Sequence, residues 1–201
     1  MIIREAKKKD CDTVASIHAE YFPYSALSKM GRRFLRLMYC FFVDSPDSFL
    51  LIAEEGGEII GIVSGSKNLN KLQKRFILKN IFVLPFILFT KVISFVFWRE
   101  AIEVLLYGSR LPDKKNIQDD LPIEEMTSLV VKKDYQKKGI GRALFLASID
   151  YFRNIGAKEI KLAVGKNLTY AQSFYESLGC IRVMELKRGE NKISYIYTFK
   201  L

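Results

Sequence analysis

The sequence predicts an α/β or α+β domain with a mixed central sheet of about seven strands, flanked by helices. Short apolar runs typical of strands follow one another between amphipathic segments along the 201 residues. Gly and Pro residues separate many of these segments. Hydrophobic residues make up 49% of the chain and charged residues 27%, which is a globular composition. We therefore expect one domain over residues 1–201, with a hydrophobic helical insertion at about 67–118.

The elements before the insertion are predicted from alternation, caps and turn residues. The N-terminal residues alternate as a short strand. Asp10 is a candidate N-cap for the first helix, and Pro23 ends that helix. A second helix is expected because apolar residues recur at helical spacing, and Gly56-Gly57 between two apolar runs predicts a hairpin. The strands are expected at residues 1–6, 48–55 and 58–66, and the helices at 11–22 and 25–42.

The elements after the insertion alternate between strand and helix. The first helix here has Leu144, Ile149 and Phe152 on its inward side, and Gly156 stops it. Asn167 is expected to cap the next helix, which Gly179 closes. A hairpin completes the chain. The strands are expected at residues 123–131, 159–164, 180–187 and 192–201, and the helices at 140–156 and 167–179.

The chain is strongly basic. It has 32 Lys and Arg residues against 22 Asp and Glu residues, a formal net charge of +10. Such an excess is compatible with a solvated surface or with binding to an anionic ligand, a nucleic acid or an anionic membrane face. The net charge alone does not distinguish these possibilities.

Metal and disulfide chemistry are not expected. Cys11, Cys40 and Cys180 are far apart without C-x-x-C spacing, and His18 is the single histidine. Buried free thiols in a reducing compartment are the simplest account. The N-terminus shows no hydrophobic leader pattern, so we expect a cytoplasmic protein.

The stretch QKKGIGR, residues 136–142, lies where a strand pattern gives way to a helix pattern. Backbone N–H groups are unpaired at a helix start, and glycines let a ligand approach them, so the stretch predicts an anion cradle suited to pyrophosphate. Leu144 replaces the third glycine of a dinucleotide-binding G-x-G-x-x-G motif, and no P-loop sequence is present. For these glycines alone, a tight turn without a ligand is the alternative.

The surrounding residues make the interpretation more specific. QKKGIG matches a Q/R-x-x-G-x-G/A motif, SLVV lies upstream of it, and NLTYAQSFYESLGC lies downstream. Over residues 123–180 this combination resembles the GNAT superfamily of N-acetyltransferases. The opening strand and helix are also similar to that family, and residues 22–66 look like a bacterial subgroup with a hydrophobic insertion before the fourth strand. The resemblance implies a sheet that splays between its fourth and fifth strands.

The resemblance also implies acetyl-CoA as co-substrate, bound where those strands part. Strand backbone would pair with the pantetheine amides, and the cradle would hold the pyrophosphate. Asn167 matches an Asn that hydrogen-bonds the pantetheine arm, although one residue more than usual separates it from Ala171. The implied cofactor-binding residues are Leu129, Val130, Val131, Gln136, Lys137, Lys138, Gly139, Ile140, Gly141, Arg142, Ala143, Asn167 and Tyr175.

Two residues are candidates for proton transfer. Tyr175 matches the family's Tyr that protonates the departing thiolate, and aromatic packing is its alternative role. A carboxylate is needed to accept the proton of the acceptor ammonium. Glu125 and Glu124 are both candidates, and Glu125 is preferred because it would share the face of Leu129 and Val131 in an unbulged strand; a solvated strand end is the alternative.

The acceptor cleft is expected to involve the first helix, which is often an acceptor wall in this family. His18 and Tyr21 lie in that helix and are candidate acceptor-binding residues, as is Glu124 before the fourth strand. The acceptor is expected to be a primary amine of a small molecule, such as an amino sugar, or of a protein. A non-catalytic CoA-binding module that docks a partner or a membrane surface through the insertion is the alternative function. Nucleic-acid binding is not expected, because no matching motif accompanies the charge.

The insertion contains an apolar segment at residues 81–98, with 14 apolar residues in 18. A single membrane crossing there would separate strands that one sheet requires. We expect helices that cover the acceptor cleft, pair with a second subunit as a homodimer, or lie on a membrane surface, since Lys71, Lys74, Arg75 and Lys79 flank the segment.

Overall fold

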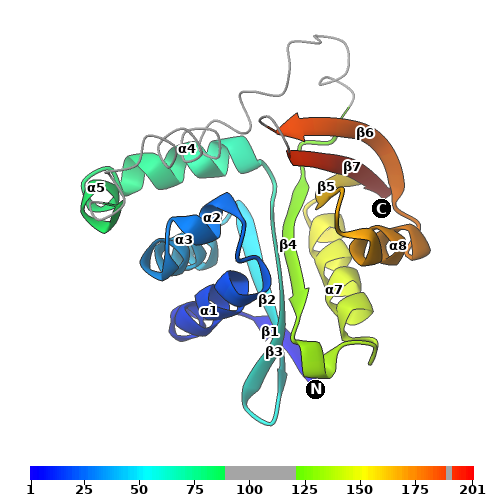
Figure 1. The fold of residues 1–201 in the computed structure, drawn as a ribbon, viewed down its shortest axis with the longest axis horizontal. Coiled ribbons are helices and arrows are strands. Elements are labelled where there is room, and N and C mark those ends of the chain that lie inside the picture. Colours follow the sequence, from blue (N-terminus) through cyan, green and yellow to red (C-terminus); the bar gives the residue numbers. More distant parts are fainter. Residues whose placement is uncertain (89–120, 189–191) are drawn as a thin grey trace.

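A single open sheet organises the chain (Figure 1). The structure is a computed structural model that describes residues 1–88, 121–188 and 192–201. The sheet has seven strands in the order β1-β2-β3-β4-β5-β7-β6, which confirms the expected mixed sheet. The β4–β5 pair is parallel and the other neighbouring pairs are antiparallel. The strands are β1 (Ile2–Glu5), β2 (Ser48–Glu55), β3 (Glu58–Ser66), β4 (Glu125–Val131), β5 (Glu159–Gly165), β6 (Ile181–Arg188) and β7 (Lys192–Lys200).

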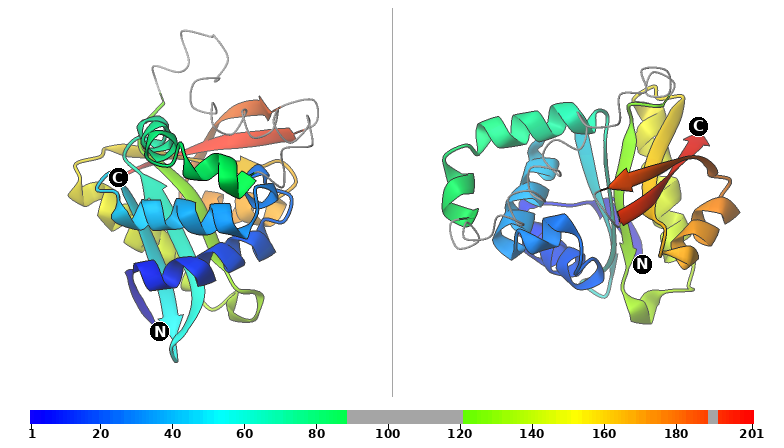
Figure 2. Two further views of the ribbon diagram at one scale, coloured as in Figure 1. Left: turned by 90° about the vertical axis from the view of Figure 1, so that its left-hand side faces the viewer. Right: turned by 45° about the horizontal axis from the view of Figure 1, so that its top comes forward.

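Helices cover both faces of the sheet (Figures 1 and 2). One face carries α1, α2 and α3, and the other carries α7 and α8. The helices are α1 (Cys11–Tyr21), α2 (Ala26–Lys29), α3 (Arg32–Asp44), α4 (Leu69–Lys79), α5 (Val83–Leu88), α7 (Ile140–Asn154) and α8 (Thr169–Ser177). Short 3-10 turns, η1 (Lys8–Asp10) and η3 (Lys133–Tyr135), precede α1 and the entrance to α7.

Each face of the sheet has its own hydrophobic core. On the α7 face, Phe145 and Phe152 are fully buried against apolar residues of β2, β3 and β5. On the α1–α3 face, Leu35 packs with Ile52 and Ile62. Burial of a large apolar side chain contributes roughly 1.5–3 kcal/mol. The two cores hold the strands between them, and they fix the position of β4 at the centre of the sheet.

The expected insertion begins with α4 and α5, which pack beside α3. The rings of Phe34 and Phe41 both contact the ring of Phe76 on α4, with centroids 5.7 and 5.4 Å apart. Residues 89–118 of the insertion, and so much of the apolar segment 81–98, lie outside the described residues. The single domain over the whole chain therefore stays a prediction. Nowhere in the described ranges is a helix long and apolar enough to cross a bilayer.

Two local expectations need correction. The second helix is not continuous, because Gly31 at φ +94° separates α2 from α3. Asp10 is the N-cap residue of α1, as expected, but its side chain makes no capping hydrogen bond. Its carboxylate instead accepts hydrogen bonds from the Lys7 backbone at 2.8 Å and from Arg4 at 2.7 Å, which ties the start of α1 to β1.

Candidate active site

The sheet opens between β4 and β5. These strands pair at two positions only, Glu125 with Lys161 and Met126 with Leu162, although both strands continue further. On its other side β4 stays paired with β3 up to its last residue. The edge of Leu129–Val131 that faces β5 therefore has no strand partner in the described part of the chain. An unpaired strand edge offers N–H and C=O groups to an extended ligand.

A concave turn of backbone amides lies beyond the open end of β4. Lys137 has φ +60° and Gly139 has φ +81°, so two left-handed residues, separated only by Lys138, stand just before α7 begins at Ile140. Such alternation turns successive N–H groups toward one point and forms an anion-binding nest. A non-glycine residue in this conformation is strained, and Lys137 therefore marks a functional candidate.

The glycines of this turn have different surroundings. A Cβ built on Gly139 would meet no atom within 4 Å, so the backbone there is open to a ligand. A Cβ on Gly141 would lie 3.4 Å from the ring of Phe174. Ile140 is buried at the first position of α7, where it joins the core, while Ala143 is half-buried one turn further. The expected cradle is therefore open on the Gly139 side and closed on the Gly141 side.

Positive charge surrounds the cradle. Lys137, Lys138 and Arg142 are all exposed, and in the described ranges none of them forms an ion pair with a carboxylate. Lys138 lies over the ring of Tyr135, with Nζ 5.2 Å from the centroid. Together with the α7 dipole, these cations favour an anion with more than one charge.

Side chains from three elements hold the cradle in place. Gln136 Nε2 donates to the last backbone carbonyl of β4 at 2.9 Å. The N–H of Lys133 donates to Tyr21 Oη on α1 at 2.7 Å, and Tyr135 Oη donates to Glu58 on β3 at 3.0 Å. The side chain of Gln136, which was predicted to bind the anion, is thus hydrogen-bonded to the backbone of β4. It helps to hold the shape of the cradle.

A β-bulge interrupts β4 near its start. Ser64 of β3 lies opposite Ser128. The next residue of β3 lies opposite Met126, so Thr127 is an extra residue in β4. The hydroxyls of Thr127 and Ser64 are 2.8 Å apart, which fixes the bulge to β3.

The bulge reverses the face on which Glu125 lies. Met126, Leu129 and Val131 pack in the α7 core, whereas Val130 packs in the α1–α3 core. Alternation from Met126 places Glu125 on the α1–α3 face. The expectation that Glu125 shares the face of Leu129 and Val131 is therefore wrong, because it assumed a strand without a bulge.

Glu125 occupies an enclosed, charged corner. It is 7% exposed and lies opposite Lys161 across the β4–β5 pair. Burial lowers the pKa of Lys161, and the charges of Glu125 and Glu124 oppose that shift. Lys161 Nζ also donates to the carbonyl of Pro122. Glu124 is half-buried next to this corner, where its carbonyl accepts from the Lys161 N–H at 2.9 Å.

His18 is part of a buried pair on the same face. Its Nδ1 lies 2.7 Å from Tyr39 Oη, and the side chains are only 3% and 1% exposed. Burial lowers the pKa of His18 to about 4 and raises that of Tyr39. The ring is too enclosed to line an acceptor cleft, so the expected acceptor contact of His18 finds no support. Tyr21, the other wall candidate, has its hydroxyl engaged by the cradle.

Tyr175 lies within the α7 core, 8% exposed, with its ring between Phe145 and Phe174. Burial raises its pKa, so the phenol stays protonated at neutral pH. Among the described residues its hydroxyl has no hydrogen-bond partner. Every fully enclosed side-chain polar atom in the same ranges does have one. The hydroxyl of Tyr175 is therefore not fully enclosed.

Asn167 does not cap the last helix. Leu168 is the N-cap of α8, without a side-chain cap, and Asn167 is exposed in the preceding turn. Gln172 holds that turn instead, since its Nε2 donates to the carbonyls of Gly165 and Lys166 at 3.1 and 2.8 Å. The extra residue before Ala171 has thus moved the helix start past Asn167.

Several site residues were missed from the sequence. Thr127 and Ser64 had a weak signal, since hydroxyl residues interrupt otherwise apolar strands. Lys161 had a similar one, a charge inside a strand. Phe174 had none, because its contact with Gly141 depends on how α8 packs. In the described residues, no group of three potential metal ligands occurs.

Comparisons with known proteins support the GNAT acetyltransferase family. Residues 109–180 match the model of the Acetyltransferase (GNAT) family. A curated relative, N-alpha-acetyltransferase 30 of Schizosaccharomyces pombe, is 42% identical over 72 residues, which cover 34% of this chain and 48% of that protein. The chain thus spans about half the length of that relative.

Solved structures share the fold over nearly the whole chain. An N-acetyltransferase from Staphylococcus aureus Mu50 has a TM-score of 0.66 at 18% identity and covers 99% of this chain and 100% of its own. Arabidopsis thaliana NAA60 in complex with acetyl-CoA has a TM-score of 0.58 at 18% identity, with 100% and 98% covered. The paia N-acetyltransferase from Thermoplasma acidophilum in complex with coenzyme A has a TM-score of 0.60 at 16% identity, with 100% and 98% covered.

Proposed function

We propose that this chain is a GNAT N-acetyltransferase that transfers an acetyl group from acetyl-CoA to a primary amine. The observation that carries the proposal is the opening between β4 and β5 after Met126, with the amide nest of Lys137 to Gly141 beyond it. Acetyl-CoA supplies the acetyl thioester, and the reaction is a direct attack in a ternary complex.

The proposed binding residues suit each part of the co-substrate. The unpaired edge of Leu129–Val131 offers backbone groups to the pantetheine amides. The nest and the α7 dipole suit a pyrophosphate, and exposed Lys137, Lys138 and Arg142 add positive charge. Asn167 remains a candidate for the pantetheine arm from its turn.

We assign the acid role to Tyr175. Burial holds its phenol in the protonated form, and among the described residues its hydroxyl has no hydrogen-bond partner that would compete for the proton. A general acid of this kind would deliver its proton to the departing sulfur.

We assign the base role to Glu125, now on the α1–α3 face. An ammonium has no lone pair, so the acceptor must lose a proton before it attacks. A carboxylate next to the opening of the sheet is suited to accept that proton, directly or through water. The nearby Lys161 limits this role, because its positive charge attracts the same carboxylate that has to accept the proton of the acceptor.

The acceptor is proposed to be a small-molecule amine, such as an amino sugar, or a protein amine. The name of the S. pombe relative favours a protein N-terminus among these. The setting is proposed to be the cytoplasm, consistent with the three free cysteines.

A panel of amines tests the proposal. The chain is incubated with acetyl-CoA and amino sugars, polyamines or peptides with free N-termini, while released thiol is measured. We expect thiol release with at least one amine class and none with N-terminally blocked, lysine-free peptides. Tight CoA binding with no release for any class would instead support a non-catalytic CoA-binding module.

A further inference from the structure

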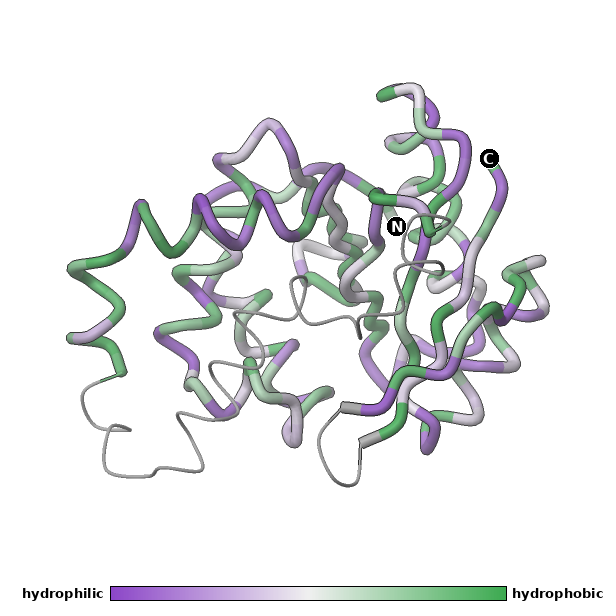
Figure 3. The backbone as a smooth tube through the Cα atoms, turned by 90° about the horizontal axis from the view of Figure 1, so that it is seen from above, coloured by the Kyte–Doolittle hydropathy of each residue, from purple (hydrophilic) through white to green (hydrophobic). Residues whose placement is uncertain are grey.

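Large apolar side chains are exposed together at the end of α4 and along α5. Phe82 is 91% exposed, Phe86 80% and Leu78 70%, and two further apolar residues, Ile81 and Val83, are exposed between them. Figure 3 shows hydrophilic α4 giving way to hydrophobic α5. A contiguous exposed apolar patch marks an interaction surface.

Basic residues adjoin these apolar side chains. Lys71, Lys74, Arg75 and Lys79 are exposed on α4, and in the described ranges the three lysines have no carboxylate partner. The sequence between Glu58 and Glu100 contains seven Lys and Arg residues and no acidic residue. Arg75 pairs with Asp47 of the neighbouring loop, so the unpaired lysines give this surface a net positive charge.

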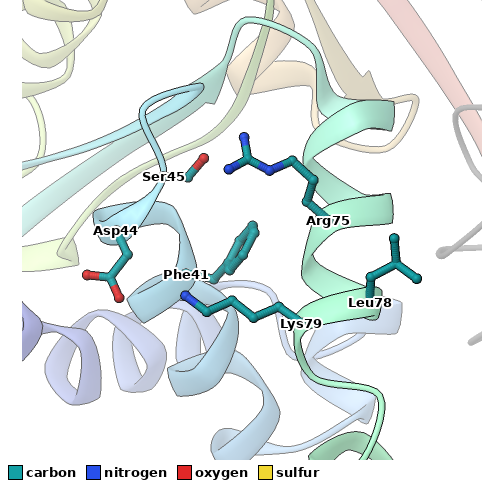
Figure 4. A pocket seen from close by; sticks show the side chains of 6 residues that line it. All are labelled: Phe41, Asp44, Ser45, Arg75, Leu78 and Lys79. Carbon is teal, nitrogen blue, oxygen red and sulfur yellow. The ribbon is translucent and has the colours of Figure 1, made fainter.

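A shallow hollow joins the two kinds of side chain (Figure 4). Arg75, Leu78 and Lys79 of α4 line it together with Phe41, Asp44 and Ser45 at the end of α3, so one carboxylate lies among its basic residues. Lys79 Nζ lies 5.6 Å from the centroid of the Phe41 ring, so the ammonium stands directly beside apolar surface. Cations beside exposed apolar groups match the boundary between lipid headgroups and acyl chains.

We propose that this α4–α5 surface, residues 71–86, docks on an anionic lipid bilayer. Phe82, Phe86 and Leu78 enter the headgroup boundary, and the α4 lysines lie against lipid phosphates. The helices lie on the membrane and do not cross it. α5 lies on the far side of the molecule from α8, so docking leaves the α8 side clear (Figure 1).

The charge argues against a second copy of the chain as the occupant. A second copy of the chain would bring identical positive surfaces together, which is repulsive. An anionic bilayer provides both the apolar phase and the opposite charge.

Vesicle sedimentation tests the proposal with the full chain. We expect wild type to sediment with vesicles of 30% phosphatidylglycerol in phosphatidylcholine about tenfold more than with phosphatidylcholine alone. The double variant Phe82→Ser/Phe86→Ser is expected to lose most of this binding. Each Lys→Gln change at Lys71 or Lys74 is expected to lower it about fivefold, from roughly 1 kcal/mol per basic residue.

A matched control removes exposed apolar side chains elsewhere. Ile181→Thr/Val183→Thr alters the edge strand β6, where both side chains are exposed, and should bind vesicles as wild type does. Circular dichroism and thermal unfolding confirm that each variant folds. Equal sedimentation with both vesicle types, binding unaffected by the Phe82/Phe86 change, or a Phe82-dependent dimer in light scattering without vesicle binding would each overturn the proposal.

Discussion

The backbone N–H of Lys133 donates a hydrogen bond to Tyr21 Oη at 2.7 Å. The two residues are 112 positions apart in the chain. This bond joins the end of α1, on one face of the sheet, to the turn that leads into the amide nest at the start of α7. Helix α1 therefore has a direct part in positioning the proposed pyrophosphate site.

Tyr21→Phe should weaken CoA binding more than it lowers turnover. Loss of the hydroxyl removes one hydrogen bond, with a cost of about 1 kcal/mol in unfolding free energy, and loosens the turn before the cradle. We expect a several-fold rise in KM for acetyl-CoA with kcat nearly unchanged. Tyr24→Phe, at an 85% exposed position just after α1, is the control. An unchanged KM in Tyr21→Phe would show that α1 does not help to position the cradle.

Gly139→Ala should weaken CoA binding strongly. A residue with a Cβ in the left-handed region costs roughly 1–2 kcal/mol, and here the Cβ also enters the space left for the ligand. Gly57, in the β2–β3 hairpin, has φ +83° against +81° for Gly139, and both have open surroundings. Gly57→Ala should lose similar stability and keep CoA affinity, as calorimetric titration would measure. Equal effects of the two changes on CoA binding would contradict the cradle.

Tyr175→Phe should lower kcat by about 10²-fold and leave CoA affinity unchanged, because only the acidic proton is removed. Because burial raises the pKa of Tyr175, the activity of wild type should show no loss from ionisation of this phenol up to about pH 10. Tyr151→Phe is the matched control, since its pKa is also raised by burial and it lies on the other helix of this face. Unchanged turnover in Tyr175→Phe would remove the acid role.

Glu125→Gln should make acetylation depend on the acceptor's own ionisation. Without a base, activity at neutral pH is expected to fall roughly 10²-fold and to recover as pH rises toward the pKa of the amine. Glu124→Gln, one residue away and half-buried, should keep the profile of wild type. A pH–rate profile measured for both variants distinguishes them, and the opposite ranking would transfer the base role to Glu124.

Acid should destabilise the protein partly through His18. The pKa of His18 is lowered from 6.5 to about 4, so the unfolded chain binds more protons between these values. This part of the stability is complete above about pH 6.5 and is lost as pH falls toward 4, by about 3 kcal/mol. Urea unfolding of wild type and His18→Gln across this range checks it. The variant should show a shallower dependence on pH, and parallel curves would count against the buried pair.

The sequence predicts the order of the elements and the cradle, because those features depend on local chemistry. Gly139 and Gly156 are both left-handed at the helix boundaries where they were expected. The apolar periodicity places Leu144, Ile149 and Phe152 in the core. Such features need only the residue and its near neighbours.

The errors come from features that depend on distant partners. The bulge at Thr127 depends on the register of β4 against β3, where Thr127 contacts Ser64, and the sequence of β4 gives only a weak signal of it. The carboxylate of Asp10 does not cap α1 because it accepts a hydrogen bond from Arg4 of β1, a partner that the sequence does not reveal. The face of Glu125 therefore followed from the tertiary structure, not from counting along the strand.

The central claim is that the amide nest at the start of α7 holds a pyrophosphate and β4 holds the pantetheine arm. Titration of the ¹⁵N-labelled protein with CoA and, separately, with pantetheine tests it directly by amide chemical shifts. We predict that CoA moves the amides of Lys138, Gly139, Gly141 and Leu129, and that pantetheine moves Leu129 alone. Shifts by CoA that leave Gly139 and Gly141 unchanged would contradict the account.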